Sequence, residues 1–251
     1  FLEVHTQNRL SILAACEDPT TVSTFDYSGE VWPLPQTGQM WLEYELLKNP
    51  DLKGVYCVST SYRQEAHPVE GRHDLIFPMF EFESPGNFND LISLEHNLCE
   101  YLGFLPVDYL SHDYLTWCDI FHTEELTHEH EKNMMEMHPS GVGFITRFPY
   151  STSPFWNMRQ SADGKHANKV DVIMHGVETI GSAQRSSNAE EMRSQFYNIS
   201  DGNYANLLFS NFTKKRVEKE LDKFLKFNFF QRCGGGIGMT RLIRAMKLSN
   251  L

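Results

Sequence analysis

The sequence lacks the features of a membrane or secreted protein. No apolar run approaches the ~18 residues that a membrane-spanning helix needs, and no signal-peptide pattern stands at its start. The five cysteines are an odd number without a C-x-x-C spacing. This excludes a disulfide framework and a cysteine zinc site, and it is typical of reduced thiols. We therefore expect a soluble, cytoplasmic protein with no membrane partner.

Positive charge is also scarce. Lys and Arg number 22 against 33 Asp and Glu, which gives a net charge of −11 and a pI near 5.4. This balance argues against a broad nucleic-acid surface, although it leaves room for a local basic patch. The 251 residues, 41% of them hydrophobic, are enough for the core of one large domain or two small ones.

Two alternating segments form the most informative stretch. Residues 54–62 alternate apolar residues such as Val55 and Cys57 with smaller polar ones. Residues 75–83 place Phe80 and Phe82 on one face and Glu81 and Glu83 on the other, so that both segments are predicted to be strands. The loop between them, residues 64–74, contains the turn formers Pro68 and Gly71. The stretch therefore predicts a β-hairpin.

Charged groups stand at both ends of that loop. Arg63 and Glu65 lie where it begins, and Arg72 and His73 lie where it ends. Two guanidiniums and an imidazole directed at one space suit an anionic ligand such as a polyphosphate. Phe77 offers a flat face to a base. The alternative is a hairpin with a charged, solvated loop.

A second pattern lies near the C-terminus. Gly234, Gly236 and Gly238 allow a strand to run into a helix with its backbone close to a ligand, and Arg241 lies about one turn into that helix. No acidic residue follows about 20 positions later, so this is not a dinucleotide-binding fingerprint.

Together the two patterns resemble motifs 2 and 3 of the class II aminoacyl-tRNA synthetases, in the subgroup for aspartate, asparagine and lysine. The resemblance implies an α+β fold with an antiparallel sheet flanked by helices. It covers nearly the whole chain and implies one catalytic domain over residues 1–251, without an anticodon-binding domain. Residues 1–9 resemble the end of motif 1, which implies a homodimer, although Gln7 stands where the family has Pro.

The resemblance also implies an ATP site. Arg63 would contact the α-phosphate, while Phe77 and Arg241 would enclose the adenine. Ile76 replaces an acidic residue of the family pattern. The full set of residues that the resemblance assigns to ATP is Arg63, Glu65, Arg72, His73, Phe77, Gly236, Gly238 and Arg241.

Two carboxylates predict a metal site. Residues 170–174 read as a strand that carries Asp171, and Glu178 follows seven residues later across a turn at Gly176. Carboxylates that face bound phosphates are the ligands that Mg²⁺ prefers. We therefore expect Asp171 and Glu178 to bind Mg²⁺, with Glu178, Arg63 and Arg241 as the catalytic residues.

Two charged residues are candidates for binding the amino-acid substrate. Residues 181–185 resemble the Ser-Gly-Ala-Gln-Arg segment of aspartyl enzymes, which implies that Arg185 holds the substrate side chain by bidentate hydrogen bonds. Glu17 lies in a segment that resembles the one in which aspartyl enzymes have a glutamate that binds the substrate ammonium. The resemblance implies the same role for Glu17. The alternative for Glu17 is an ordinary loop carboxylate.

The pocket floor resembles two members of the family at once. Residues 33–48 imply that Gln36 and Gln39 bind the ammonium or carboxylate of the substrate. Leu42 stands where aspartyl enzymes have a lysine, and Glu43 after it matches the asparaginyl pattern. The sequence thus leaves open whether aspartate or asparagine is the substrate, and Glu43 is either a pocket residue or a surface residue.

Residues 106–140 are acidic and rich in histidine. His128 and His130 flank a glutamate, but side chains two positions apart on a helix point in different directions. The segment therefore predicts a solvated helix rather than a metal site. Apolar residues at helical spacing predict packing helices over residues 89–102 and 214–227.

The function implied is ATP-dependent activation of a carboxylate as an acyl-adenylate. A chain without the anticodon-binding domain resembles the archaeal asparagine synthetases related to asparaginyl-tRNA synthetase, which would make this protein an AMP-forming aspartate–ammonia ligase. The alternatives are the catalytic core of an asparaginyl- or aspartyl-tRNA synthetase, an enzyme that uses another small amine, and a non-catalytic sensor. The acidic charge balance favours a small acceptor over tRNA.

Overall fold

The computed structural model describes residues 1–6, 9–68, 74–104, 110–137 and 140–251. Gln7, Arg72 and His73 lie outside the described residues. In the described part of the chain, no helix is both long and apolar enough to cross a lipid bilayer.

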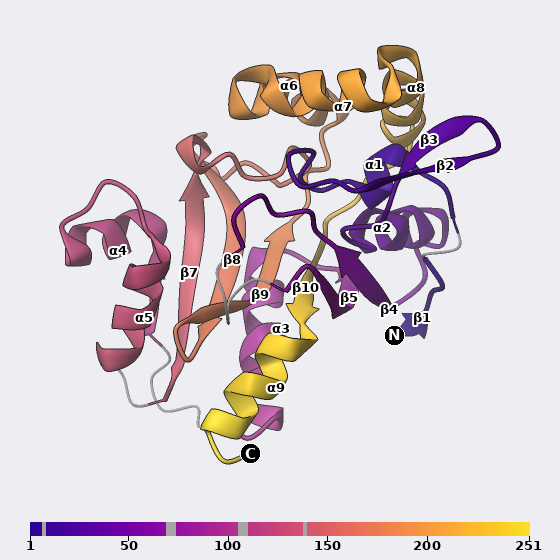
Figure 1. Ribbon diagram of the computed structural model, residues 1–251. Coiled ribbons are helices and arrows are strands. Elements are labelled where there is room, and N and C mark those ends of the chain that lie inside the picture. Colours follow the sequence, from indigo (N-terminus) through magenta and orange to yellow (C-terminus); the bar gives the residue numbers. More distant parts are fainter. Residues whose placement is uncertain (7–8, 69–73, 105–109, 138–139) are drawn as a thin grey trace.

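An eight-stranded sheet forms the centre of the molecule (Figure 1). The outermost pair at each edge is parallel, and all the pairs between them are antiparallel. This confirms the antiparallel sheet expected from the sequence. The strands, in their order across the sheet, are β1 (Leu2–Glu3), β4 (Val55–Tyr62), β5 (Ile76–Pro85), β10 (Arg232–Gly238), β9 (Val177–Gln184), β8 (His166–Met174), β7 (Val142–Pro149) and β6 (Leu110–Asp113).

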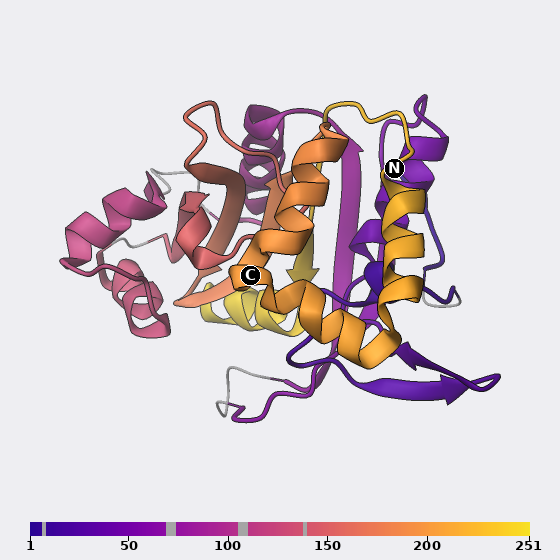
Figure 2. The ribbon, with the colours of Figure 1, turned by 90° about the horizontal axis from the view of Figure 1, so that it is seen from above.

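Helices flank the sheet on both sides, as expected. Helices α6, α7 and α8 lie together over the strands, and α4 and α5 stand beside β7 (Figures 1 and 2). The helices are α1 (Ile12–Ala15), α2 (Gln39–Lys48), α3 (Phe88–Tyr101), α4 (Tyr114–Phe121), α5 (His128–Met137), α6 (Ala189–Asn198), α7 (Asn203–Phe212), α8 (Lys214–Phe224) and α9 (Met239–Leu248).

The two largest of the four apolar clusters in the described residues hold these layers together. On one face of the sheet, Leu91 of α3 and Ala245 of α9 are fully buried against the strands. On the other side, Phe196 of α6, Leu208 of α7 and Phe224 of α8 are fully buried in a core shared with α1 and α2. Each such large side chain contributes roughly 1.5–3 kcal/mol by leaving water. The second core fixes the helices above the strands.

The predicted strands and helices of the central hairpin, of residues 89–102 and of residues 214–227 are present as β4, β5, α3 and α8. Residues 10–32 contain α1 and a hairpin of β2 (Thr24–Tyr27) and β3 (Glu30–Pro33). The hairpin turns at Ser28 and Gly29, both with positive φ, as a two-residue turn requires. That Ser-Gly pair between two alternating segments was an available signal.

Residues 106–140 were expected as one solvated helix. The described part contains β6, α4 and α5, and Trp117 of α4 is fully buried and donates to the carbonyl of Phe144 at 3.2 Å. The expectation was wrong for α4 because an aromatic cluster covers β7 there.

Candidate active site

A cavity of about 720 Å³ lies on the side of β5, β9 and β10 that faces α1, α2 and α7. It brings together residues that are far apart in the sequence. Eleven of the candidate residues line it, namely Glu17, Gln39, Glu43, Arg63, Glu65, Phe77, Glu178, Arg185, Gly236, Gly238 and Arg241. Gln36 and Asp171 do not line it.

Two arginines mark one end of the cavity. Arg63 follows β4, its Nε donates to Ser61 Oγ at 3.2 Å, and its guanidinium pairs with the carboxylate of Glu17. Arg241 lies in the first turn of α9, and its Nη1 donates to the carbonyl oxygen of Glu178 at 2.7 Å. Both side chains line the same cavity as Phe77. Two cations and an aromatic ring at one end suit a nucleotide polyphosphate.

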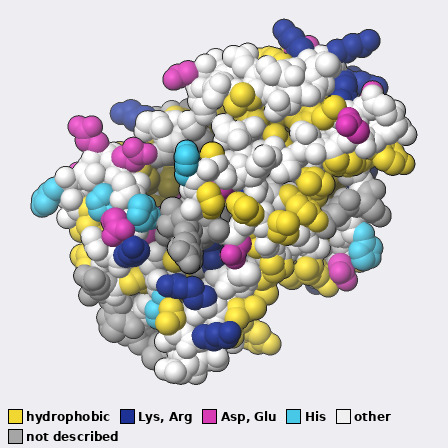
Figure 3. All heavy atoms as spheres, viewed as in Figure 1, with side chains coloured by type: hydrophobic (Ala, Val, Ile, Leu, Met, Phe, Trp, Pro, Cys, Tyr) yellow, Lys and Arg dark blue, Asp and Glu magenta, His cyan; other side chains and the backbone are white. Residues whose placement is uncertain are grey.

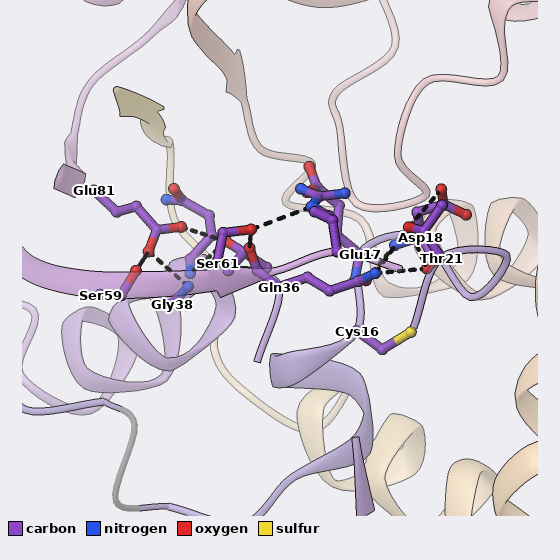
Figure 4. Close-up of polar contacts among 12 residues, drawn as sticks. Cys16, Glu17, Asp18, Thr21, Gln36, Gly38, Ser59, Ser61 and Glu81 are labelled. Carbon is purple, nitrogen blue, oxygen red and sulfur yellow. Dashed lines mark hydrogen bonds and ion pairs between the residues drawn. The ribbon is translucent and has the colours of Figure 1, made fainter. Parts of the chain in front are cut away.

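Gln36 does not face a ligand. Its Oε1 accepts from the backbone N–H groups of Glu17 and Asp18 at 2.9 and 2.8 Å, and its Nε2 donates to the Asp18 carbonyl and to Thr21 Oγ1 at 2.9 and 3.1 Å (Figure 4). These four bonds occupy both protons and both lone pairs of the amide. The assignment of Gln36 to the substrate was therefore wrong, since this buried side chain holds the loop that carries Glu17.

Glu81 is a cavity residue that the sequence analysis did not identify. Its Oε2 accepts from the Gly38 backbone N–H at 2.7 Å and from Ser59 Oγ at 2.6 Å, and its Oε1 accepts from Thr37 (Figure 4). Burial raises the pKa of this carboxyl. Glu81 lies on the inward face of β5, so the alternation of that strand was an available signal.

Glu43, Arg185 and Asn157 line the other end of the cavity. Together with Glu83 and Arg232, which do not themselves line it, they form a floor of paired charges. Glu43 accepts from Arg232 Nε and Nη2 at 2.9 and 2.6 Å and from Asn157 Nδ2 at 2.6 Å. Arg185 Nε donates to Glu83 Oε2 at 3.3 Å. The two acidic and two basic side chains are buried, and with Glu83 ionised they carry two charges of each sign. This floor is therefore electrically balanced.

Two acceptors of this floor have no hydrogen-bond partner among the described residues, namely Glu83 Oε1 and Asn157 Oδ1. A buried acceptor without a donor destabilises the protein, and a ligand that donates an N–H group to it removes this penalty. Burial raises the pKa of Glu83 to about 7. Gly234 allows the Glu83 carboxylate to lie against the backbone of β10, because a Cβ at this position would be only 2.2 Å from Glu83 Oε2.

The proposed metal ligands lie near each other on β8 and β9. A Cβ at Gly181 would meet Glu178 Oε1 at 2.9 Å and Asp171 Oδ1 at 3.7 Å. Asp171 Oδ2 accepts from Lys169 Nζ at 2.6 Å, and Asp171 Oδ1 is buried without a partner in the described part of the chain. Mg²⁺ commonly takes one or two protein carboxylates plus substrate phosphates, so this pair fits a Mg²⁺ ion that accompanies a nucleotide.

No group of three or more His, Cys, Asp or Glu residues that could hold a metal ion by itself occurs in the described ranges, which include His128 and His130. The five cysteines are all buried and unpaired as disulfides, as the sequence predicted.

Comparison with known protein families assigns the chain. The family model described as tRNA synthetases class II (D, K and N) matches residues 15–250. The chain belongs to this family. Among curated relatives, the aspartate–tRNA(Asp) ligase of Thermoplasma acidophilum is 24% identical over 96% of this chain and 59% of its own length, and the asparagine–tRNA ligase of Mycoplasma mobile is 26% identical over 71% of this chain and 37% of its own. The chain thus spans less than two thirds of the length of these relatives.

Solved structures show the same fold. The asparaginyl-tRNA synthetase of Pyrococcus horikoshii complexed with asparaginyl-adenylate superposes with a TM-score of 0.79 at 19% identity, covering 98% of this chain and 60% of that one. The aspartyl-tRNA synthetase of Entamoeba histolytica superposes with a TM-score of 0.72 at 17% identity, covering 98% of this chain and 50% of that one. The chain thus has the fold of the class II synthetase family, with its sheet and flanking helices.

Proposed function

We propose that this class II protein activates aspartate with ATP and transfers the activated acyl group to ammonia, giving asparagine, AMP and pyrophosphate. A carboxylate oxygen of aspartate attacks the α-phosphorus, the bond to the β-phosphate oxygen breaks, and pyrophosphate leaves. Ammonia then attacks the acyl carbon and AMP leaves. No protein nucleophile is needed, so catalysis consists of positioning and of charge neutralisation at the phosphates.

The cavity offers a residue for each of these tasks. Arg63 would bind the α-phosphate beside the carboxylate that attacks it, Phe77 would stack on the adenine, and Arg241 would contact the γ-phosphate. Asp171 and Glu178 would hold Mg²⁺, which supplies positive charge to the phosphates. The backbone of Gly236 and Gly238 leaves room for the nucleotide along one wall of the cavity.

The balanced charges of the floor are the observation that supports an amino acid as the substrate. An amino acid presents an α-ammonium and an α-carboxylate together, which is a neutral pair that matches the floor. The α-carboxylate would meet Arg185, and the α-ammonium would donate to Glu83 Oε1 and Asn157 Oδ1, the two buried acceptors that lack a donor. Aspartate bound in this way directs its β-carboxylate toward Arg63. An isolated side-chain carboxylate fits poorly, because it has no proton to donate and adds an unbalanced charge.

A second candidate is the activation of asparagine for transfer to tRNA. A carboxamide also combines one acceptor with two N–H donors, so it would match the same floor. Basic side chains over α8 favour a polyanionic acceptor (Figure 3). Glu218 and Asp222 of this helix pair with Lys214 and Arg193. The exposed lysines Lys215, Lys219 and Lys223 of α8 follow at intervals of four residues and therefore share one face, and the exposed Lys226 follows the end of the helix.

The experiment that separates these candidates measures ATP consumption with aspartate, with and without ammonium, together with free asparagine. Formation of asparagine and AMP that depends on ammonium would support the ligase. Asparagine-dependent pyrophosphate exchange without any free amide would support the second candidate. Replacing Lys215, Lys219, Lys223 and Lys226 by alanine should then weaken salt-sensitive tRNA binding without slowing exchange. Absence of ATP turnover with either amino acid would reject both.

We also propose that the protein is a homodimer. On the face of β4 and β5 turned away from the cavity, Val58 and Ile76 are each 63% exposed. Large apolar side chains exposed together on a sheet are typical of an interaction surface. Light scattering on Val58→Glu and Ile76→Glu variants tests this, since both should become monomeric if this face joins two copies.

A further inference from the structure

Lys169 on β8 occupies an unusual place beside the carboxylates expected to hold metal. Its Nζ lies 2.6 Å from Asp171 Oδ2 and 3.9 Å from the centre of the Phe148 ring. Its side chain is 23% exposed and lines the cavity, while that of Asp171 is 9% exposed. The ammonium is therefore held between a buried carboxylate and an aromatic face, rather than extended into solvent.

The surroundings of this lysine are acidic. Glu178 lies on the next strand with its Oε1 close to Gly181, and Glu131 Oε2 accepts from the backbone N–H of Glu178 at 3.3 Å. Lys169 thus forms a direct ion pair with Asp171, and further carboxylates lie on the neighbouring elements.

We propose that Lys169 is a built-in cation of the phosphate site, whose ammonium pairs with Asp171 in the nucleotide-free protein and keeps a divalent metal ion from that carboxylate until ATP binds. The inference deepens the proposed function, since it concerns the part of the cavity assigned there to ATP and Mg²⁺. Because like charges repel at short range in a partly buried site, the ammonium weakens divalent metal binding in the absence of nucleotide. Phosphates bring the negative charge that offsets this repulsion.

Two consequences follow for the order of binding. The free protein takes up divalent metal poorly, and Mg²⁺ enters together with ATP. With a nucleotide present, the ammonium of Lys169 adds one fixed positive charge to those of Arg63 and Arg241.

The test measures Mn²⁺ binding to the nucleotide-free protein at pH 8 by electron paramagnetic resonance of the free ion. Lys169→Met should bind Mn²⁺ at least about tenfold more tightly than the wild type, because the repelling charge is gone while Asp171 and Glu178 remain. Lys169→Arg keeps the charge and should bind as weakly as the wild type. Equal Mn²⁺ affinity in the wild type and Lys169→Met would overturn the proposal.

Two further variants keep the result interpretable. In Lys169→Met/Asp171→Asn the tight binding should be lost, which shows that it runs through Asp171. If Lys169→Met does not give a cooperative thermal transition, Lys169→Gln provides the same loss of charge with a polar group toward Asp171, and the same affinities decide. These measurements use no substrate, so failure of the ligase assay leaves them valid, and their failure leaves the ligase assay valid.

Discussion

The two ends of the cavity hold their charges in different ways. At the floor, Glu43 and Arg232 are fully buried, and two nitrogens of the guanidinium donate to the same carboxylate oxygen. The end of the cavity marked by Arg63 and Arg241 is called the phosphate end, because the proposed function places the ATP phosphates there. At this end the Arg63 side chain is 21% exposed and its partner Glu17 is 47% exposed. Buried charges must keep their partners for the fold to persist, whereas exposed ones exchange partners with water at little cost.

This difference separates structure from function within one cavity. Floor charges serve the packing of α2 against β10 as well as any ligand, so changing them affects stability first. Charges at the phosphate end contribute little to stability, so changing them affects activity first. The following predictions test this division.

Arg232→Met should have the largest effect on stability. It leaves Glu43 buried with Asn157 as its remaining close donor, and breaking a buried pair by removing one partner costs about 3–5 kcal/mol. Urea unfolding measures the change. The control is Arg193→Met, which breaks an exposed pair with Asp222 and should cost less than about 1 kcal/mol. Similar losses in both variants would contradict the division.

Arg241→Ala should act in the opposite way. Loss of a cation that meets the transferring nucleotide should slow pyrophosphate exchange by about 10²–10³-fold, with little change in the free energy of unfolding. Arg244→Ala is the matched control, because Arg244 lies on the same helix, donates to the His175 carbonyl at 3.3 Å and does not line the cavity. Exchange at the wild-type rate in Arg241→Ala would remove this residue from the ATP site.

The floor should also give the binding of aspartate a pH dependence. Burial raises the pKa of Glu83 to about 7, above the value of 4.5 usual for this group. Below that pKa the carboxyl is protonated and accepts an ammonium poorly, so the KM for aspartate should fall by about tenfold as the pH rises from about 6 to about 7.5. The KM is measured at saturating ATP.

Glu83→Gln is the control for this dependence, because its amide does not titrate, and its KM for aspartate should be higher and nearly flat over the same range. A wild-type KM that does not change with pH would exclude Glu83 from the binding of the substrate ammonium.

The sequence predicted the phosphate end better than the floor. Period-2 alternation and glycine spacing identified β4, β5 and β10, and these strands deliver Arg63 and Phe77 directly to the cavity. The floor combines residues from five separate segments, and an isolated charged residue such as Arg232 gives no local signal of burial. Their pairing depends on tertiary structure, which single-sequence patterns do not encode.

Gln36 shows a second reason for failure. An amide offers the same donors and acceptors to a ligand and to its own backbone, so residue type alone cannot distinguish the two. Here the loop of residues 16–21 uses all four hydrogen bonds. Lys169 was missed for a similar reason, since a lysine on a strand usually extends into solvent.

Glu17→Gln should have the smallest effect. It tests whether the exposed pair of Glu17 and Arg63 affects ATP binding rather than stability. Since its pair with Arg63 is partly exposed, the free energy of unfolding should change by less than about 1 kcal/mol. Loss of the carboxylate frees Arg63 for the α-phosphate, so the KM for ATP should fall by about threefold while the KM for aspartate stays constant. Glu30→Gln, which removes an exposed partner of Arg216 away from the cavity, should change neither constant. A KM for aspartate that rises in Glu17→Gln would instead return Glu17 to the substrate ammonium, and the floor would then bind the other end of the amino acid.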